Sequence, residues 1–219
     1  MTQNVIAGRE NAIRTLRRLA GRRPQTEHCE FCSSNLSSSH RHLLEIETRR
    51  AVCVCDPCAL RFENVIGRWK LIPRDPITLS DFNLTEAEWE GFALPINLAF
   101  FFQSTPAKKV VAMYPSPAGA TESLLSLGAW DALVVANPIL KRMQSDVEAL
   151  LVNRLGASPE YYIAPIDMCF ELVGIIRLHW RGFSGGPDVW KEIGGFFDKL
   201  KSMTRHPTAM SNAEEACHA

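Results

Sequence analysis

The sequence predicts an α+β protein in which an N-terminal metal module of the zinc-ribbon or rubredoxin-like kind precedes a mixed α+β domain. Two Cys-x-x-Cys pairs within residues 29–58 predict the module. Apolar runs of strand length, interspersed with helical patterns, predict the second domain. Pro73 and Pro76 mark the boundary, because proline interrupts both kinds of element. We therefore expect a basic amphipathic helix over residues 1–26, the metal module over 27–74, the α+β domain over 75–203 and a disordered tail over 204–219.

The expected metal ligands are four cysteines: Cys29, Cys32, Cys55 and Cys58. Two thiolates three positions apart can face one ion across a tight knuckle, and two such pairs complete a tetrahedral four-sulfur site. Between the pairs, residues 42–47 and 51–55 are β-prone and predict a hairpin that brings the knuckles together. Zinc is the expected metal and iron the alternative, because Ser33 and Ala59 stand where a rubredoxin-like iron site usually has glycine.

Other residues of the same stretch allow further interpretations. Strand alternation places Cys53 on the side of Cys55, so we expect Cys53 to be a thiol beside the ligands or an alternative ligand, and otherwise a small buried core residue. A nuclease of the HNH type would use a histidine such as His40 or His42, but no partner histidine follows Cys58 closely. Disulfide pairing is disfavoured because no signal peptide opens the chain.

The net charge of the chain is zero, but the charge is unevenly distributed. Residues 1–74 contain 13 Lys and Arg against 7 Asp and Glu, whereas residues 75–219 contain 11 against 17. A basic first third favours binding to nucleic acid, to an acidic partner or to the acidic remainder of the chain. Residues 4–20 predict the basic helix, which we expect to be solvated or docked on protein, so nucleic acid is disfavoured. No apolar run reaches transmembrane length, and we expect a cytoplasmic protein.

Local patterns predict the remaining elements. The expected strands are residues 68–72, 96–102, 110–114, 161–166 and 169–180. The expected helices are residues 59–66, 85–92, 127–136, 145–155 and a last helix that begins near residue 185. Thr85 with Glu88, and Ser145 with Glu148, match the capping box that starts a helix. Pro187 suits the first turn of the last helix.

The second domain contains no recognisable catalytic motif. It lacks the Gly-x-Ser-x-Gly elbow, the P-loop and the Gly-x-Gly-x-x-Gly turn. Cys169 and His179 are ten residues apart on an expected strand, too far to act together, so we interpret Cys169 as a core residue. Residues 115–122 and 180–187 predict two rigid loops, which form either a partner-binding edge or plain connections. The candidate partner-binding residues are Tyr114, Ser116, Gly119, Thr121, Glu122, Arg181 and Phe183.

Three stretches carry a resemblance to a known family: HRHLLEIETRRAVCVCDPCAL at residues 40–60, MYPSPAGATES at 113–123 and PIDMCFELVGIIRLHWRGFSGG at 165–186. They are similar to an uncharacterised bacterial family found among the accessory proteins of actinobacterial-type nickel–iron hydrogenases. The likeness covers about residues 29–200 and brings no catalytic residues with it. It implies a role in hydrogenase assembly or maturation.

The expected function is therefore that of a non-enzymatic accessory protein. The resemblance implies that its client is a hydrogenase subunit or another maturation factor. A rubredoxin-like electron-transfer protein and a zinc-ribbon nucleic-acid-binding protein are the alternatives. Visible colour would distinguish an iron tetrathiolate from zinc, and a steep loss of binding with salt would indicate nucleic acid.

Overall fold

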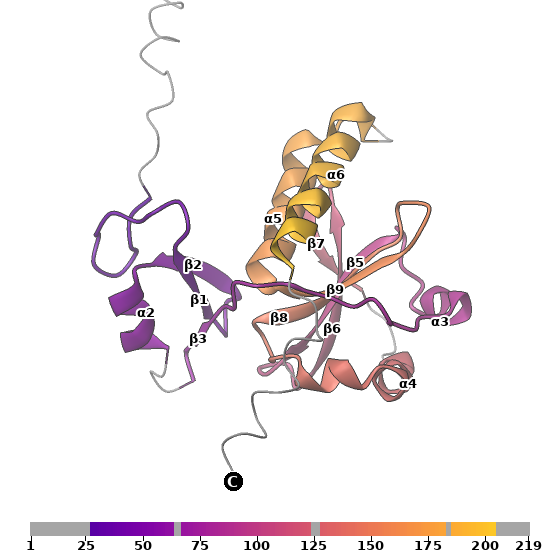
Figure 1. Ribbon diagram of the computed structural model, residues 1–219, viewed down its shortest axis with the longest axis horizontal. Coiled ribbons are helices and arrows are strands. Elements are labelled where there is room, and N and C mark those ends of the chain that lie inside the picture. Colours follow the sequence, from indigo (N-terminus) through magenta and orange to yellow (C-terminus); the bar gives the residue numbers. More distant parts are fainter. Residues whose placement is uncertain (1–26, 64–66, 124–127, 183–184, 205–219) are drawn as a thin grey trace, which may run out of the picture.

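The computed structural model describes residues 27–63, 67–123, 128–182 and 185–204 (Figure 1). These residues form two antiparallel sheets, one of three strands in the order β2-β1-β3 and one of six in the order β4-β9-β8-β5-β6-β7. Helices accompany both sheets, so the α+β fold class is confirmed. The predicted basic helix, and all but the first residue of the predicted tail, lie outside the described residues. No helix in the described parts is long and apolar enough to cross a membrane.

The predicted metal module consists of a hairpin, a short helix and a third strand. Its elements are β1 (Arg41–Glu45), β2 (Arg50–Val54), α2 (Asp56–Phe62) and β3 (Trp69–Leu71). The predicted hairpin is confirmed, and Arg49 closes it with a left-handed φ of 56°. The predicted helix over residues 59–66 begins earlier, at Asp56, because Pro57 is accommodated in its first turn. A small core of five buried residues holds the module together: Cys29, Leu43, Val52, Val54 and Ala59.

The six-stranded sheet forms the middle layer of the second domain. Its strands are β4 (Ile77–Thr78), β5 (Leu98–Ser104), β6 (Lys109–Ser116), β7 (Gly119–Glu122), β8 (Glu148–Asn153) and β9 (Glu160–Pro165). Alternate residues of β5 enter different cores: Phe100 and Phe102 face one layer of helices, whereas Ala99 and Phe101 face the other. Coverage on both faces explains why this strand is continuously apolar.

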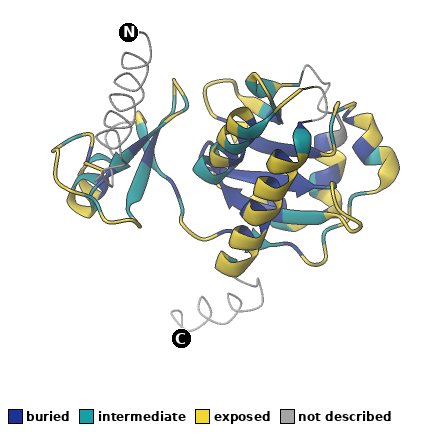
Figure 2. Ribbon diagram, turned by 90° about the horizontal axis from the view of Figure 1, so that it is seen from above, coloured by how far each residue is buried: buried dark blue, intermediate teal, exposed yellow. Residues whose placement is uncertain are grey.

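Two sets of helices cover the sheet. The helices are α3 (Glu86–Gly91), α4 (Gly128–Ala136), the 3₁₀ helix η1 (Pro138–Arg142), α5 (Ile166–His179) and α6 (Gly186–Met203). Helices α5 and α6 lie side by side on one face, and α3, α4 and η1 pack on the other (Figure 1). In Figure 2 the strands are mostly dark blue beneath helices whose outward surfaces are yellow.

Two predicted elements of the second domain are wrong. Residues 148–153 form strand β8 instead of a helix, and all six side chains are buried, as a central strand between two layers of helices requires. The carboxylate of Glu148 accepts a hydrogen bond from the backbone N–H of Gln144 (2.7 Å), so it does not serve the expected capping box.

The expected strand over residues 169–180 is instead most of helix α5. Its buried residues recur at spacings of three and four, at Ile166, Cys169, Leu172, Val173 and Ile176, which places them on one helical face. The run is rich in β-branched and other large apolar residues, and these concealed the helical period in the sequence.

The metal module packs directly against the second domain. Leu44 and Ile72 of the module belong to the same apolar cluster as the α5 and α6 face of the large sheet. Lys70 donates from Nζ to the backbone carbonyl of Ser145 (2.6 Å), and the Arg49 guanidinium lies 5.2 Å from the centre of the Phe102 ring. The module is thereby held at one side of the larger sheet (Figures 1 and 2).

Candidate metal centre

The four predicted cysteine ligands converge in the module. The Sγ atoms of Cys29, Cys32, Cys55 and Cys58 all lie within 4.8 Å of one another. The Sγ atoms of Cys32 and Cys55 are 3.6 Å apart. Four sulfurs at 2.3 Å from a tetrahedral zinc ion would be separated by about 3.8 Å. The donor atoms and their spacing therefore fit a single tetrahedral metal ion.

The two pairs reach this position in different ways. Cys29 and Cys32 lie in a tight turn closed by hydrogen bonds from Ser33 N to Cys29 O and from Cys29 N to Ser34 O, both 2.8 Å. Ser33 adopts a left-handed φ of 60°, the conformation for which glycine is the usual residue after such a pair. Cys55, by contrast, is the residue before α2, and Cys58 lies in that helix's first turn. The second pair is thus placed by a helix, whereas the sequence predicted a second knuckle.

The environments of the thiols differ. Hydrogen bonds from Ser34 lower the pKa of Cys32 to about 6. The pKa of Cys29 is also lowered, because hydrogen bonds from the backbone of Cys55 and nearby residues outweigh the burial that would raise it. The pKa of Cys58 is raised, first by burial and then by its hydrogen bond with Cys55. Four adjacent thiolates would repel one another, so a divalent cation is needed to keep the whole set deprotonated.

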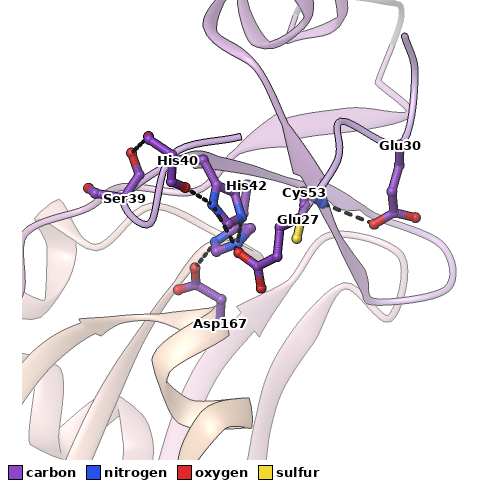
Figure 3. Close-up of polar contacts among 8 residues, drawn as sticks. Glu27, Glu30, Ser39, His40, His42, Cys53 and Asp167 are labelled. Atoms are coloured by element: carbon purple, nitrogen blue, oxygen red, sulfur yellow. Dashed lines mark hydrogen bonds and ion pairs between the residues drawn. The ribbon is translucent and has the colours of Figure 1, made fainter. Parts of the chain in front are cut away.

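Cys53 belongs to a different group of side chains. Its sulfur and the ring nitrogens of His40 and His42 lie within 4.8 Å of one another, on the side of the hairpin that faces α5 (Figure 3). Cys53 and Cys55 do not lie on the same side of one strand, as strand alternation predicted, because β2 ends at Val54 and the chain then turns into α2. Burial, followed by the negative charges of Glu27 and Glu30, raises the pKa of Cys53.

The first predicted recognition loop is a β-hairpin. Residues 115–122 span the end of β6, a tight turn and the edge strand β7. The Ser116 hydroxyl donates to the backbone carbonyl of Gly119 (2.9 Å), and it lies 3.1 Å from the Thr121 hydroxyl. Glu122 pairs with Lys109 at 3.1 Å. These candidate residues therefore have partners within the chain, and Tyr114 pairs with Thr121 across the two strands.

The second predicted loop follows the end of α5. Arg181 donates from one guanidinium nitrogen to the backbone carbonyls of Leu178 (3.1 Å) and Trp180 (2.9 Å) at the end of α5. A Cβ atom added to Gly119 would lie 3.7 Å from the side chain of Arg177, one turn earlier in α5. The structure thus brings the hairpin turn close to the end of α5. Phe183 lies outside the described residues, and a partner-binding role for this edge stays a prediction.

Cys169 is fully buried on α5, which confirms its interpretation as a core residue. Burial also raises its pKa. The sequence did not reveal that Asp167, at the start of the same helix, meets His42. These residues are 125 positions apart, so no local pattern connects them.

Comparison with known families assigns the chain to a family. A model described as a family of unknown function (DUF5947) matches residues 28–204, which include both the metal module and the second domain. Its description assigns no activity, and it makes no reference to hydrogenases. Comparison with curated proteins and with solved structures gives no match.

Proposed function

Because the chain belongs to DUF5947, a family of unknown function, we propose a function from its own residues: it is a zinc-binding accessory protein that binds a partner protein and catalyses no reaction itself. The convergence of four cysteine sulfurs within 4.8 Å carries the proposal. A zinc ion held by four protein ligands has no open position for a substrate, and such ions serve to stabilise small modules.

The size of the module supports a structural role for zinc. Only five of its described residues form its own buried core, whereas most residues of two extensive apolar clusters lie in the second domain. Small modules of this kind depend on the metal, and its binding contributes on the order of 10 kcal/mol to their folding. Zinc would therefore hold together the β1–β2 hairpin and α2.

Metal analysis tests this part of the proposal. Protein purified under reducing conditions should contain zinc and no visible chromophore. The double variant Cys32→Ser, Cys55→Ser should contain one zinc ion fewer per chain. Cys169→Ala, which removes a thiol from the core of the other domain, should keep the zinc content of the wild type. Stoichiometric iron with visible absorption would favour the alternative function, electron transfer.

The end of α5 is the surface that we propose for the partner. Leu178 is 66% exposed and Trp190 is 46% exposed, and Trp190 packs against Trp180, whose carbonyl accepts a hydrogen bond from Arg181. Apolar, aromatic and arginine side chains are the types that dominate interface energies. The turn of the nearby β6–β7 hairpin, where a Cβ atom on Gly119 would lie 3.7 Å from the side chain of Arg177, extends this edge. The resemblance described above supports a nickel–iron hydrogenase subunit or maturation factor as the client.

Co-purification with tagged hydrogenase subunits and maturation factors tests the client. Leu178→Ala combined with Arg181→Ala should weaken capture about tenfold or more, as loss of one or two interface anchors does. Val135→Ala is the matched control, since Val135 is 76% exposed on α4, which covers the opposite face of the sheet. Both variants should keep the zinc content and melting temperature of the wild type. Undiminished capture by the double variant would exclude this surface.

A further inference from the structure

A second group of candidate metal ligands lies between the module and the second domain. It consists of His40, His42 and Cys53, whose donor atoms lie within 4.8 Å of one another. His42 pairs directly with Cys53 in the β1–β2 register, and His40 is two residues before His42, so all three can share one face of the hairpin. Figure 3 shows the imidazoles meeting above Asp167, with the Cys53 sulfur nearby.

The hydrogen bonds of the two histidines determine which nitrogens carry protons. His42 Nδ1 lies 2.6 Å from Oδ2 of Asp167, and His40 Nδ1 lies 3.0 Å from the carbonyl oxygen of Ser37. Both partners are acceptors, so each Nδ1 is a donor. Glu27 adds a second acceptor, with its carboxylate 3.4 Å from His40 Nδ1. In each neutral imidazole, Nε2 is therefore the nitrogen with a free lone pair.

These two Nε2 atoms face each other at 3.1 Å. Lone pairs at this distance repel unless a positive charge lies between them, which must be either a proton on one ring or a metal ion. Two imidazoles bound to tetrahedral zinc at 2.0–2.1 Å have nitrogens about 3.3 Å apart, close to the separation seen here. The Cys53 thiol supplies a third ligand of a type that zinc binds readily.

The surroundings also match those of metal-bound histidines. In such histidines the other ring N–H almost always donates to a carboxylate or a backbone carbonyl. Here the partner of His42 is the Asp167 carboxylate, and the partner of His40 is the carbonyl of Ser37. The Asp167 carboxylate is itself oriented, because its other oxygen accepts from the backbone N–H of Met168 at 2.9 Å. Each Nδ1 atom thus has a hydrogen-bond acceptor, while the two Nε2 atoms point toward each other.

We propose that His40, His42 and Cys53 form a second metal site, separate from the four-cysteine centre. This site binds one divalent metal ion that accepts nitrogen and sulfur ligands, as zinc does. Asp167 is a positioning residue that fixes the tautomer and orientation of His42. A tetrahedral ion with three protein ligands keeps one open position. His40, His42 and Asp167 line a cavity of about 580 Å³, so water or a small ligand within it could reach the ion.

This site would also connect the two parts of the molecule. His40, His42 and Cys53 belong to the module, whereas Asp167 begins α5 of the second domain. A metal ion at the histidines strengthens the positive character of the His42 N–H and hence its hydrogen bond with Asp167. The inference goes beyond the proposed accessory function and does not depend on the identity of any client.

Zinc titration of the metal-free, reduced full-length protein tests the proposal. The wild type should bind two zinc ions, and X-ray absorption should show zinc–nitrogen distances of about 2.0–2.1 Å beside zinc–sulfur distances of about 2.3 Å. His40→Gln with His42→Gln should bind one zinc ion with sulfur ligands alone. His179→Gln, which changes a histidine at the far end of α5, should still bind two.

Asp167→Asn distinguishes a positioning role from a purely structural one. It should raise the zinc dissociation constant of the second site by about 10- to 100-fold, while two ions still bind at saturation and the four-cysteine centre is unaffected. A single zinc ion with sulfur ligands alone in the wild type would overturn the proposal, and would identify a shared proton as the bridge between the rings. Retention of a second, nitrogen-ligated zinc by the double histidine variant would overturn it equally.

Discussion

Glu148 illustrates, at the scale of one residue, how burial conflicts with charge. It begins the central strand β8 and is only 9% exposed. Burial raises its pKa above the ordinary value of 4.5, although the N–H of Gln144 and the positive charge of Lys70 partly oppose this. The fold therefore favours the protonated carboxyl, and ionisation of Glu148 lowers the free energy of unfolding.

This leads to a pH-dependent prediction. The stability that Glu148 contributes is fully present below its unfolded pKa and is lost as pH rises through its higher folded pKa. Glu148→Gln cannot ionise and keeps an oxygen for the Gln144 N–H, so it should be more stable than the wild type at about pH 8. The advantage should shrink towards about pH 4. Chemical denaturation across this range measures it, with the exposed Glu192→Gln as control. An advantage independent of pH would contradict the explanation.

Individual residues also determine which parts of the site were predictable. The four cysteines form two local pairs, and the geometry of thiolate ligation makes that spacing informative without a structure. The cluster of His40, His42 and Cys53 depends on the hairpin register, and its contact with Asp167 depends on the packing of α5. Such contacts arise only in three dimensions, so the sequence showed the histidines but not their arrangement.

At the scale of elements, the start of α6 depends on one glycine. Gly185 precedes the helix with a left-handed φ of 86°. An added Cβ would lie 2.7 Å from Val189 Cγ1 and 3.2 Å from Trp180 Cε3. Both atoms belong to closely packed side chains, so neither the backbone conformation nor the available space suits alanine.

Two alanine substitutions in this region should therefore have opposite effects. Gly185→Ala should destabilise the protein by about 1–2 kcal/mol from the backbone conformation alone, and by more because of the overlap with Val189. Gly194→Ala lies in the interior of α6, where nothing within 4 Å of the new Cβ opposes it. It should stabilise the helix by about 0.5–1 kcal/mol. Thermal denaturation measures both effects. If Gly194→Ala lowers the melting temperature, the backbone entropy that glycine loses on folding does not explain the stability of α6 at this position.

The elements differ in how well the sequence predicted them. The capping box at Thr85 and Glu88 is confirmed by hydrogen bonds in both directions, because its residues meet within one helical turn. The same motif at Ser145 and Glu148 fails, since burial between two layers of helices favours a strand there. Local signals thus hold where local contacts decide the structure, and fail where packing on both faces does.

At the scale of the whole molecule, the two sheets share apolar contacts. Leu44 and Ile72 extend the module into the core beneath α5 and α6. The sequence suggested two domains at the proline-rich segment, but it contained no signal for the strand order or for this packing. Both depend on pairings between distant residues, such as those of β5 with β8.

Metal removal should separate the stabilities of the two parts. The five-residue core of the module cannot replace a zinc centre that contributes on the order of 10 kcal/mol, whereas the second domain contributes most residues of two large apolar clusters. Chelation under reducing conditions should therefore raise hydrogen exchange across β1, β2 and α2, while β5 and β8 stay protected. Readdition of zinc should restore protection in the module. If β5 and β8 lose protection together with β1, the contacts of Leu44 and Ile72 make the two parts one cooperative unit, and the module has no separate stability.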